Sequence, residues 1–116
     1  MLESAPPHRA ALLALLAVVR FDRGDARGSF EAASEARRIF EGLGGTVEGE
    51  ALIRVAWAQA LYATGQVDLA RRAILAARER LLRRAAKIQN PEWRKSFLER
   101  IREHLRILAR AGEWLT

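Results

Sequence analysis

The stretch LYATGQVDLARRAILAAR, Leu61–Arg78, carries the pattern that decides the fold. Small residues recur at helical spacing on both sides of the Gly65–Gln66 pair, and glycine is a poor residue for the interior of a helix. The pair therefore predicts a tight turn between two antiparallel helices. On the second helix an apolar stripe begins at Val67, Ala70 and Ile74. It continues through Ala77, Leu81, Ala85 and Ile88.

Composition extends this helical pattern to the whole chain. The 116 residues fit one domain with a modest core, and 50% of them are hydrophobic. Alanine, leucine, arginine and glutamate dominate, and all four are good helix formers. We therefore predict an all-α protein. The absence of cysteine excludes disulfides, thiolate metal sites and a cysteine nucleophile, and it fits a reducing compartment.

The longest apolar run, Ala10–Val19, is shorter than the roughly 20 residues that a membrane-spanning helix needs. A secretory signal is also disfavoured, because Glu3 lies in the region that should be basic. Arg20 and Asp22 then follow where a signal would have small residues for cleavage. We expect a cytoplasmic protein with no membrane partner.

Turn and capping residues divide the chain. Asp25, after Gly24, is a natural helix cap, and Gly44–Gly45 predicts the end of a helix. Asn90 predicts both the end of one helix and the cap of the next, with Pro91 in its first turn.

The predicted organisation is a lead-in, in which Ser4 is a candidate cap, followed by one domain of five helices. Its parts are the lead-in 1–7 and the domain 8–116, which comprises a hairpin 8–43, a hairpin 46–89 and a terminal helix 91–115.

The predicted helices differ in how their apolar residues are distributed. The third helix has one clear stripe, formed by Ile53, Ala56, Trp57, Ala60 and Leu61. In the first helix a stripe of larger residues is widened by Leu13 and Ala17, so this helix expects neighbours on more than one side. That stripe comprises Leu12, Leu15, Leu16 and Val19. The terminal helix has Phe97, Ile101, His104, Leu105, Leu108, Gly112 and Leu115 on one face.

The two hairpins overlay when Gly24 is aligned with Gly65, a separation of 41 residues that is typical of stacked helical repeats. In the second hairpin, small residues at the helix crossing alternate with bulky ones beside it, so that the helices can approach closely. These residues are Trp57, Ala58, Leu61, Val67, Ala70, Ile74 and Ala77. Over about residues 8–90 the chain resembles the tetratricopeptide repeat.

The resemblance has two departures. No proline closes the second repeat, where Leu82 and Arg83 continue the helix, and Ser29 stands where a small apolar residue is expected. The last segment, WRKSFLERIREHLRILARAGEWL, resembles the closing helix of tetratricopeptide regions at the end of large bacterial regulators. What the resemblance implies is a short solenoid of stacked hairpins with a terminal capping helix.

The implied function is binding of a peptide, a helix or a neighbouring domain. In tetratricopeptide arrays the first helix of each hairpin lines the concave side, so the resemblance nominates five partner-binding residues around a groove made by the first and third helices. Three lie on the face of the third helix opposite its stripe, and two arginines lie at the margins. The five residues are Arg20, Arg54, Val55, Gln59 and Tyr62. The competing interpretation is that the first and last helices simply cover this face. The outer side of the first helix is expected to meet a partner, another copy or upstream repeats.

A different class of function is suggested by the net charge of +6. Basic residues of the fourth helix lie across from its apolar stripe, and such an array suits nucleic acid or another polyanion. They are Arg72, Arg80, Arg83, Arg84 and Lys87. The competing interpretation is a solvated face, because no aromatic side chains are interleaved with these cations.

The sequence does not predict an enzyme, a cofactor or a metal site. His104 has Arg100 and Leu108 four residues away, so no helical pair of metal ligands exists around it. His8 lies far from it along the chain, and the segment GLGGTVEGE lacks the ending of a phosphate-binding loop. His104 is expected to be a packed residue. The tryptophans are expected to be core or seam residues at positions 57, 93 and 114.

Overall fold

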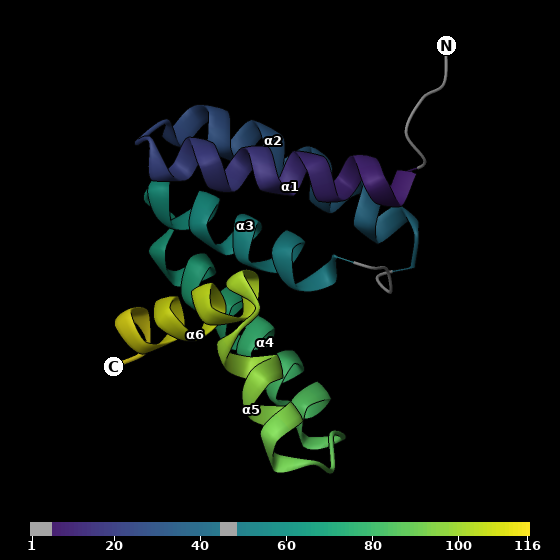
Figure 1. Cartoon of the computed structure of the whole chain (residues 1–116). Helices are drawn as coiled ribbons and strands as arrows, with labels where there is room; N and C mark the ends of the chain where they lie inside the picture. Colours follow the sequence, from purple (N-terminus) through teal and green to yellow (C-terminus); the bar gives the residue numbers. More distant parts are fainter. Residues whose placement is uncertain (1–5, 45–48) are drawn as a thin grey trace.

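The computed structural model of the chain describes residues 6–44 and 49–116, which form six α-helices and no strand (Figure 1). The prediction of an all-α chain is confirmed for these residues. The helices are α1 (Pro6–Asp22), α2 (Ala26–Gly42), α3 (Glu50–Ala63), α4 (Val67–Ala86), α5 (Pro91–Glu99) and α6 (Arg102–Trp114).

The predicted turns lie where the capping residues place them. The Asp25 side chain accepts a hydrogen bond from the Gly28 amide at 2.9 Å, and Asn90 caps α5 in the same way ahead of Pro91. Gly24 and Gly65 have φ angles of 81° and 84°, a left-handed conformation that glycine adopts without steric cost. The signals read from local sequence therefore fix these helix boundaries.

Helix ends away from these signals differ from the prediction. The fourth helix ends at Ala86, three residues before the expected Gln89. The third helix begins at Glu50. Its expected start near Thr46 or Val47, the glycine at position 45 and the lead-in residues 1–5 with Ser4 lie outside the described residues.

The prediction of one terminal helix over 91–115 is wrong, because the chain bends between α5 and α6. Ile101 has extended dihedral angles, with φ −98° and ψ 120°. Nδ1 of His104 donates to the Phe97 carbonyl at 2.7 Å across the bend, and the two rings lie 4.4 Å apart. No glycine or proline marks this break. It places α6 against α3 and α4 instead of letting it continue away from them (Figure 1).

The helices pack around two apolar clusters. The first lies between α1, α2 and α3, and the second between α3, α4 and α6. Phe30, Leu52 and Trp57 border both clusters, so α3 joins the two halves. Among the described helices, the short α5 packs only against α4 and α6.

A buried carboxylate ties α3 to α4. Glu50, at the first position of α3, is 6% exposed and accepts from Nε of Arg54 at 3.0 Å and from Nε of Arg80 at 2.9 Å. Arg54 lies one turn further along α3, whereas Arg80 comes from α4. Because two guanidinium groups compensate one carboxylate, its burial is tolerated.

The described helices include none that is long and apolar enough to cross a lipid bilayer.

Candidate functional site

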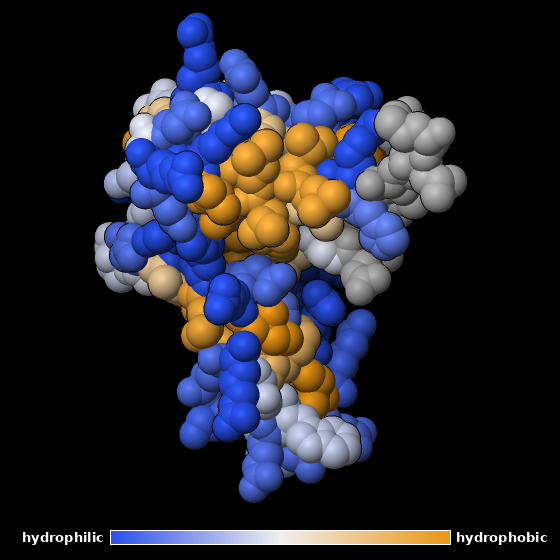
Figure 2. Space-filling model, turned by 45° about the horizontal axis from the view of Figure 1, so that its top comes forward, coloured by the Kyte–Doolittle hydropathy of each residue, from blue (hydrophilic) through white to orange (hydrophobic). Residues whose placement is uncertain are grey.

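The outer face of α1 is apolar and exposed. Figure 2 shows large apolar side chains gathered over this part of the molecule, with polar residues around them. We call this surface the α1 apolar face and define it by four residues. They are Leu12, Leu15, Leu16 and Val19, which are 59%, 50%, 39% and 40% exposed. Contiguous apolar patches of this kind mark interaction surfaces more often than scattered single residues do.

The opposite face of α1 explains why the larger residues point outward. Ala10, Ala14 and Ala17 are fully buried against the neighbouring helices, with Val18 beside them. Ser29 of α2, the apparent departure from the repeat pattern, is also buried, and its hydroxyl donates to the Ala17 carbonyl at 2.9 Å. Small residues allow α2 and α3 to approach closely, so the alanine side is packed and the leucine side is left outside.

The 41-residue repeat spacing relates the exposed side of α1 to a set of residues on α3. Counting 41 residues onward from the α1 apolar face leads to Ile53, Ala56, Trp57 and Ala60 of α3. Those α3 residues pack against the preceding hairpin, α1 and α2, in the first apolar cluster. The α1 apolar face is thus the counterpart of a surface that a preceding hairpin covers elsewhere in the same chain.

The turns of the two hairpins match in their backbone bonds as well. The Asp25 amide donates to the Arg20 carbonyl at 2.9 Å, and 41 residues later the Gln66 amide donates to the Leu61 carbonyl at 2.9 Å. The glycine one residue earlier also makes the same bond in both turns, at 3.0 Å and 3.1 Å. The register inferred from the glycines is therefore also present in the backbone geometry.

The last helix repeats the pattern once more. His104, Ile107 and Ala111 of α6 are buried, the last two in the cluster with α3 and α4, and they stand 51 residues after Ile53, Ala56 and Ala60. The interval is longer than 41 because α5 is inserted between α4 and α6. The helix α6 thus covers the second hairpin on the side that α3 covers on the first.

The position of α6 determines how exposed the partner-binding residues predicted on α3 are. Val55 and Gln59 are fully buried, and Oε1 of Gln59 accepts from Arg106 at 3.0 Å and from Arg110 at 3.1 Å. Tyr62 is 40% exposed, and its ring stacks on Trp114 at 4.4 Å. The second face of α3 is therefore covered by a neighbouring helix, which is one of the two interpretations that the sequence left open.

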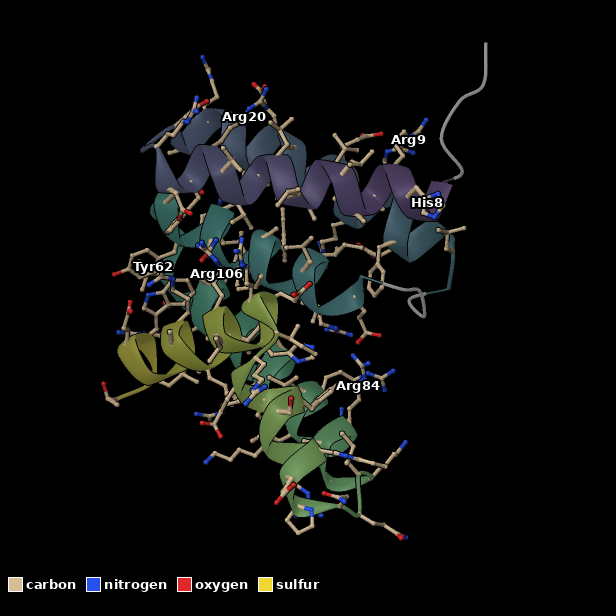
Figure 3. The ribbon with its side chains drawn as sticks, in the orientation of Figure 1. His8, Arg9, Arg20, Tyr62, Arg84 and Arg106 are labelled. Carbon is tan, nitrogen blue, oxygen red and sulfur yellow. The ribbon has the colours of Figure 1, made fainter. Side chains whose placement is uncertain are left out.

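The two predicted arginines lie apart from this face. Nη1 of Arg20 donates to the Gly28 carbonyl at 3.1 Å near the α1–α2 turn, far from Tyr62 in Figure 3. Arg54 points to another side of α3, where it pairs with Glu50. The structure does not bring the five nominated residues together on one surface.

The basic residues of α4 are divided between internal and external roles. Arg80 pairs with Glu50, and the guanidinium of Arg84 lies 5.3 Å from the centre of the Phe97 ring. Arg72 borders a groove between α2 and α4, whereas Arg83 and Lys87 are exposed. Four of the five residues predicted to bind a polyanion are therefore exposed, and Arg80 is half-buried in its ion pair with Glu50.

The histidines and tryptophans of the described residues differ in their burial and surroundings. No three histidine, aspartate or glutamate side chains there gather closely enough to hold a metal ion. His104 is buried, as predicted for a packed residue, and His8 is exposed at the start of α1 (Figure 3). Trp114 is buried in the second cluster, whereas Trp93 is 71% exposed and is not the core or seam residue that was predicted.

Sequence reasoning missed which side of α1 faces outward, because the periodicity of a helix with two apolar sides does not show which side packs. The α3 residues equivalent to the α1 apolar face lie at the interface with the first hairpin, and this burial is known only from the structure. The groove between α2 and α4 had no signal in the sequence either, because its residues come from three helices. Comparison of the chain with protein-family models, with curated proteins and with solved structures finds no match in any of the three.

Proposed function

We propose that the chain is a protein–protein interaction module of the tetratricopeptide type, working in the cytoplasm, and that the α1 apolar face receives a helical surface of its partner. The observation that supports this proposal is the exposure of four large apolar residues whose repeat counterparts on α3 are packed under a helical hairpin. Burying such side chains in a partner contributes about 25 cal/mol per Å² of apolar area.

The proposal treats the chain as the end of a helical stack. In such stacks each hairpin buries its neighbour's apolar face, and a terminal helix protects the last one. Here α6 covers the second hairpin, while the α1 apolar face has no covering element among the described residues. A module of this kind fits the end of a larger regulatory protein, where it would join other domains or partners.

The test is capture of partners from cells that express the protein, with the wild-type chain beside two variants. Leu12→Glu/Leu16→Glu alters the α1 apolar face, and Arg83→Glu/Lys87→Glu alters exposed cations at the C-terminal end of α4. We expect proteins that bind the wild-type and the α4 variant and that are lost with the α1 variant. Both variants should retain the helical circular dichroism of the wild type, because the four side chains are exposed.

Three outcomes would contradict the proposal. Partners that bind equally well to the Leu12→Glu/Leu16→Glu variant would show that another surface is used. Nucleic acid or heparin retained at low salt, and released by Arg83→Glu/Lys87→Glu, would favour the polyanion function instead. A monodisperse monomer in analytical ultracentrifugation that binds no apolar dye would also count against an exposed apolar docking face.

A further inference from the structure

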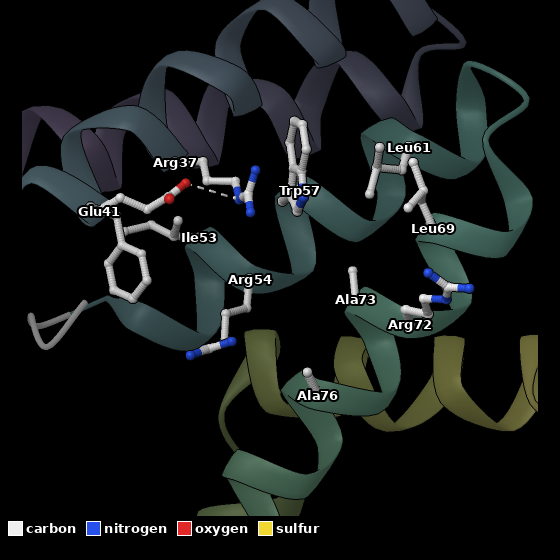
Figure 4. Close-up of a pocket in the computed structure, with 11 residues that line it drawn as sticks. Arg37, Glu41, Ile53, Arg54, Trp57, Leu61, Leu69, Arg72, Ala73 and Ala76 are labelled. Atoms are coloured by element: carbon white, nitrogen blue, oxygen red, sulfur yellow. Dashed lines mark ion pairs between the residues drawn. The ribbon is translucent and has the colours of Figure 1, made fainter. Parts of the chain in front are cut away.

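A second surface lies on the other side of the hairpins, in a groove between α2 and α4 (Figure 4). Its volume is about 540 Å³, which lies within the range of about 300–1,000 Å³ typical of ligand sites. The groove shares no residue with the α1 apolar face. Figure 4 shows side chains from α2, α3 and α4 converging around Trp57.

The walls of this groove are two separated helices. No Cα atom of α2 lies within 8 Å of a Cα atom of α4, although both helices pack on α3, so the groove opens between them over an α3 floor. On the α4 wall, Leu69, Ala73 and Ala76 follow each other at i, i+4 and i+7. A wall with alanines at this spacing allows another helix to approach closely. The floor includes Ile53 and Trp57.

The rim of the groove is positively charged. Arg37, Arg54 and Arg72 border it, together with the single carboxylate of Glu41. Nε of Arg37 lies 3.3 Å from Glu41, while its guanidinium is 4.7 Å from the centre of the Trp57 ring. Arg72 has no carboxylate partner among the described residues. The rim therefore keeps an excess of positive charge beside an apolar floor.

We propose that this groove binds an acidic amphipathic helix of a protein partner. Such a helix would place apolar residues at i, i+3, i+4 and i+7 on Trp57 and the alanine wall of α4. Its carboxylates would reach Arg37 and Arg72, whose planar guanidinium groups can hold a carboxylate by two bonds. Tryptophan and arginine are also the residues that most often dominate the energy of a protein interface.

Charge selects this occupant over a second copy of the chain. The chain has a formal net charge of +6, and the groove is bordered by three arginines and one glutamate. A second copy would bring further cations to the rim and would be repelled. The inference rests on the proposed function, since both concern protein binding, but it uses a different surface.

The experiment uses two synthetic peptides as probes and the full chain labelled with ¹⁵N. Each peptide spans about four helical turns, roughly 15 residues, with leucine and alanine on one face. The other face has glutamate in one peptide and lysine in its twin. We expect the acidic peptide to shift the Trp57 indole and the backbone amides of Leu69, Ala73 and Ala76, and to bind at least about tenfold more tightly than the lysine twin.

Two charge-reversal variants make the result specific. Arg37→Glu/Arg72→Glu should reverse the preference, so that the lysine peptide binds the groove more tightly than the acidic one. The matched control is Arg83→Glu/Lys87→Glu, which changes the net charge equally at positions outside the groove and should keep the acidic preference. Because Arg37 and Arg72 are exposed, their replacement should leave the fold intact. The amide spectra of both variants check that they are natively folded.

Several results would overturn the proposal. Equal binding of the two peptides, or equal losses in the two charge-reversal variants, would mean that only net charge is sensed. Absence of any shift at Trp57 and the α4 wall would mean that the groove binds no helix of this kind. Shifts confined to Leu12 and Leu16 would contradict the groove proposal but support binding at the α1 apolar face. Failure of the groove proposal can therefore be distinguished from failure of the proposed function.

Discussion

At the scale of single residues, the glycines divide into those that a turn requires and those that a helix merely tolerates. Gly65 has a φ of 84°, which an L-residue with a Cβ atom adopts at a cost of about 1–2 kcal/mol. Gly112 lies inside α6, and a Cβ atom added there would meet no neighbour within 4 Å. The same substitution should therefore have opposite effects at these two positions.

We expect Gly65→Ala to lower the free energy of unfolding by about 1 kcal/mol, because it strains the turn between α3 and α4. Gly112→Ala should raise it by about 0.5–1 kcal/mol, because alanine loses less backbone entropy in a helix. Urea denaturation of both variants checks the pair. Destabilisation by Gly112→Ala would contradict the open space around that residue.

The Asp22–Arg106 pair joins residues 84 positions apart, at the end of α1 and in α6. Two hydrogen bonds of 2.9 Å and 2.8 Å connect the guanidinium to both carboxylate oxygens. The Arg106 hydrogen bond lowers the pKa of Asp22 below its ordinary 3.8, against the opposing effect of desolvation, and the charge of Arg110 lowers it further. The folded state thus binds the Asp22 proton more weakly than the unfolded state.

A lowered pKa stabilises the fold at pH values above 3.8, and this contribution is lost as the pH falls through the lowered value. Because Asp22 is about half exposed, we expect Asp22→Asn to cost less than about 1 kcal/mol at neutral pH. The wild type should lose stability more steeply than the variant below pH 3.8. Denaturant titrations across pH measure this, and parallel curves for the two proteins would argue against the pair.

At the scale of the helices, α1 has two apolar sides, of which only one is packed. Leu12 is 59% exposed, whereas Ile53, its counterpart 41 residues later, is 2% exposed. The difference arises because α1 and α2 precede α3, while no described helix precedes α1. Equivalent positions of the repeat therefore contribute very differently to the stability of the isolated chain.

We expect Leu12→Ala to change the free energy of unfolding by no more than about 0.5 kcal/mol, as is usual for exposed positions. Ile53→Ala should cost about 2–5 kcal/mol, since it leaves a cavity between α1, α2 and α3. Thermal and urea denaturation at low protein concentration provide the comparison. A large loss from Leu12→Ala would show that the α1 apolar face is already covered in solution.

At the scale of the whole molecule, the chain behaves as two hairpins and a covering helix joined through α3. The clusters on the two sides of α3 share Phe30, Leu52 and Trp57 as neighbours. In stacked repeats, stability is the sum of the repeats and of the interfaces between them. Adding a hairpin in the correct register should therefore add an interface.

We expect a chain in which residues 8–48 are duplicated ahead of residue 8 to be more stable than the wild type by more than about 1 kcal/mol. The inserted hairpin would cover the α1 apolar face as α1 and α2 cover α3. Urea denaturation and hydrogen exchange of the original α1 measure the gain.

The control is the same duplication with Leu12→Glu and Leu16→Glu in the original copy, which should abolish the gain because charges would then lie in the new interface. If the duplicated chain is no more stable than the wild type, and α1 is not better protected, the α1 apolar face is not a stacking surface.

Local signals in the sequence determined the helical class, the first four helices and the repeat register. Glycine at 24 and 65, Asp25 and Asn90 act through their own dihedral angles and hydrogen bonds, so nearby residues suffice to place the turns. Periodicity placed the α3 stripe that packs on the first hairpin for the same reason. These features do not depend on which distant segments meet.

Only the tertiary structure decided the bend at Ile101, the outward side of α1, the burial of Gln59 and the groove beside Trp57. Each depends on contacts between segments far apart in the chain. When a helix is apolar on two sides, its periodicity does not show which side packs. In α1 the alanine side packs inward, because small residues permit the closer approach of neighbouring helices. The return of α6 across α3 likewise becomes visible only when the apolar faces are fitted together.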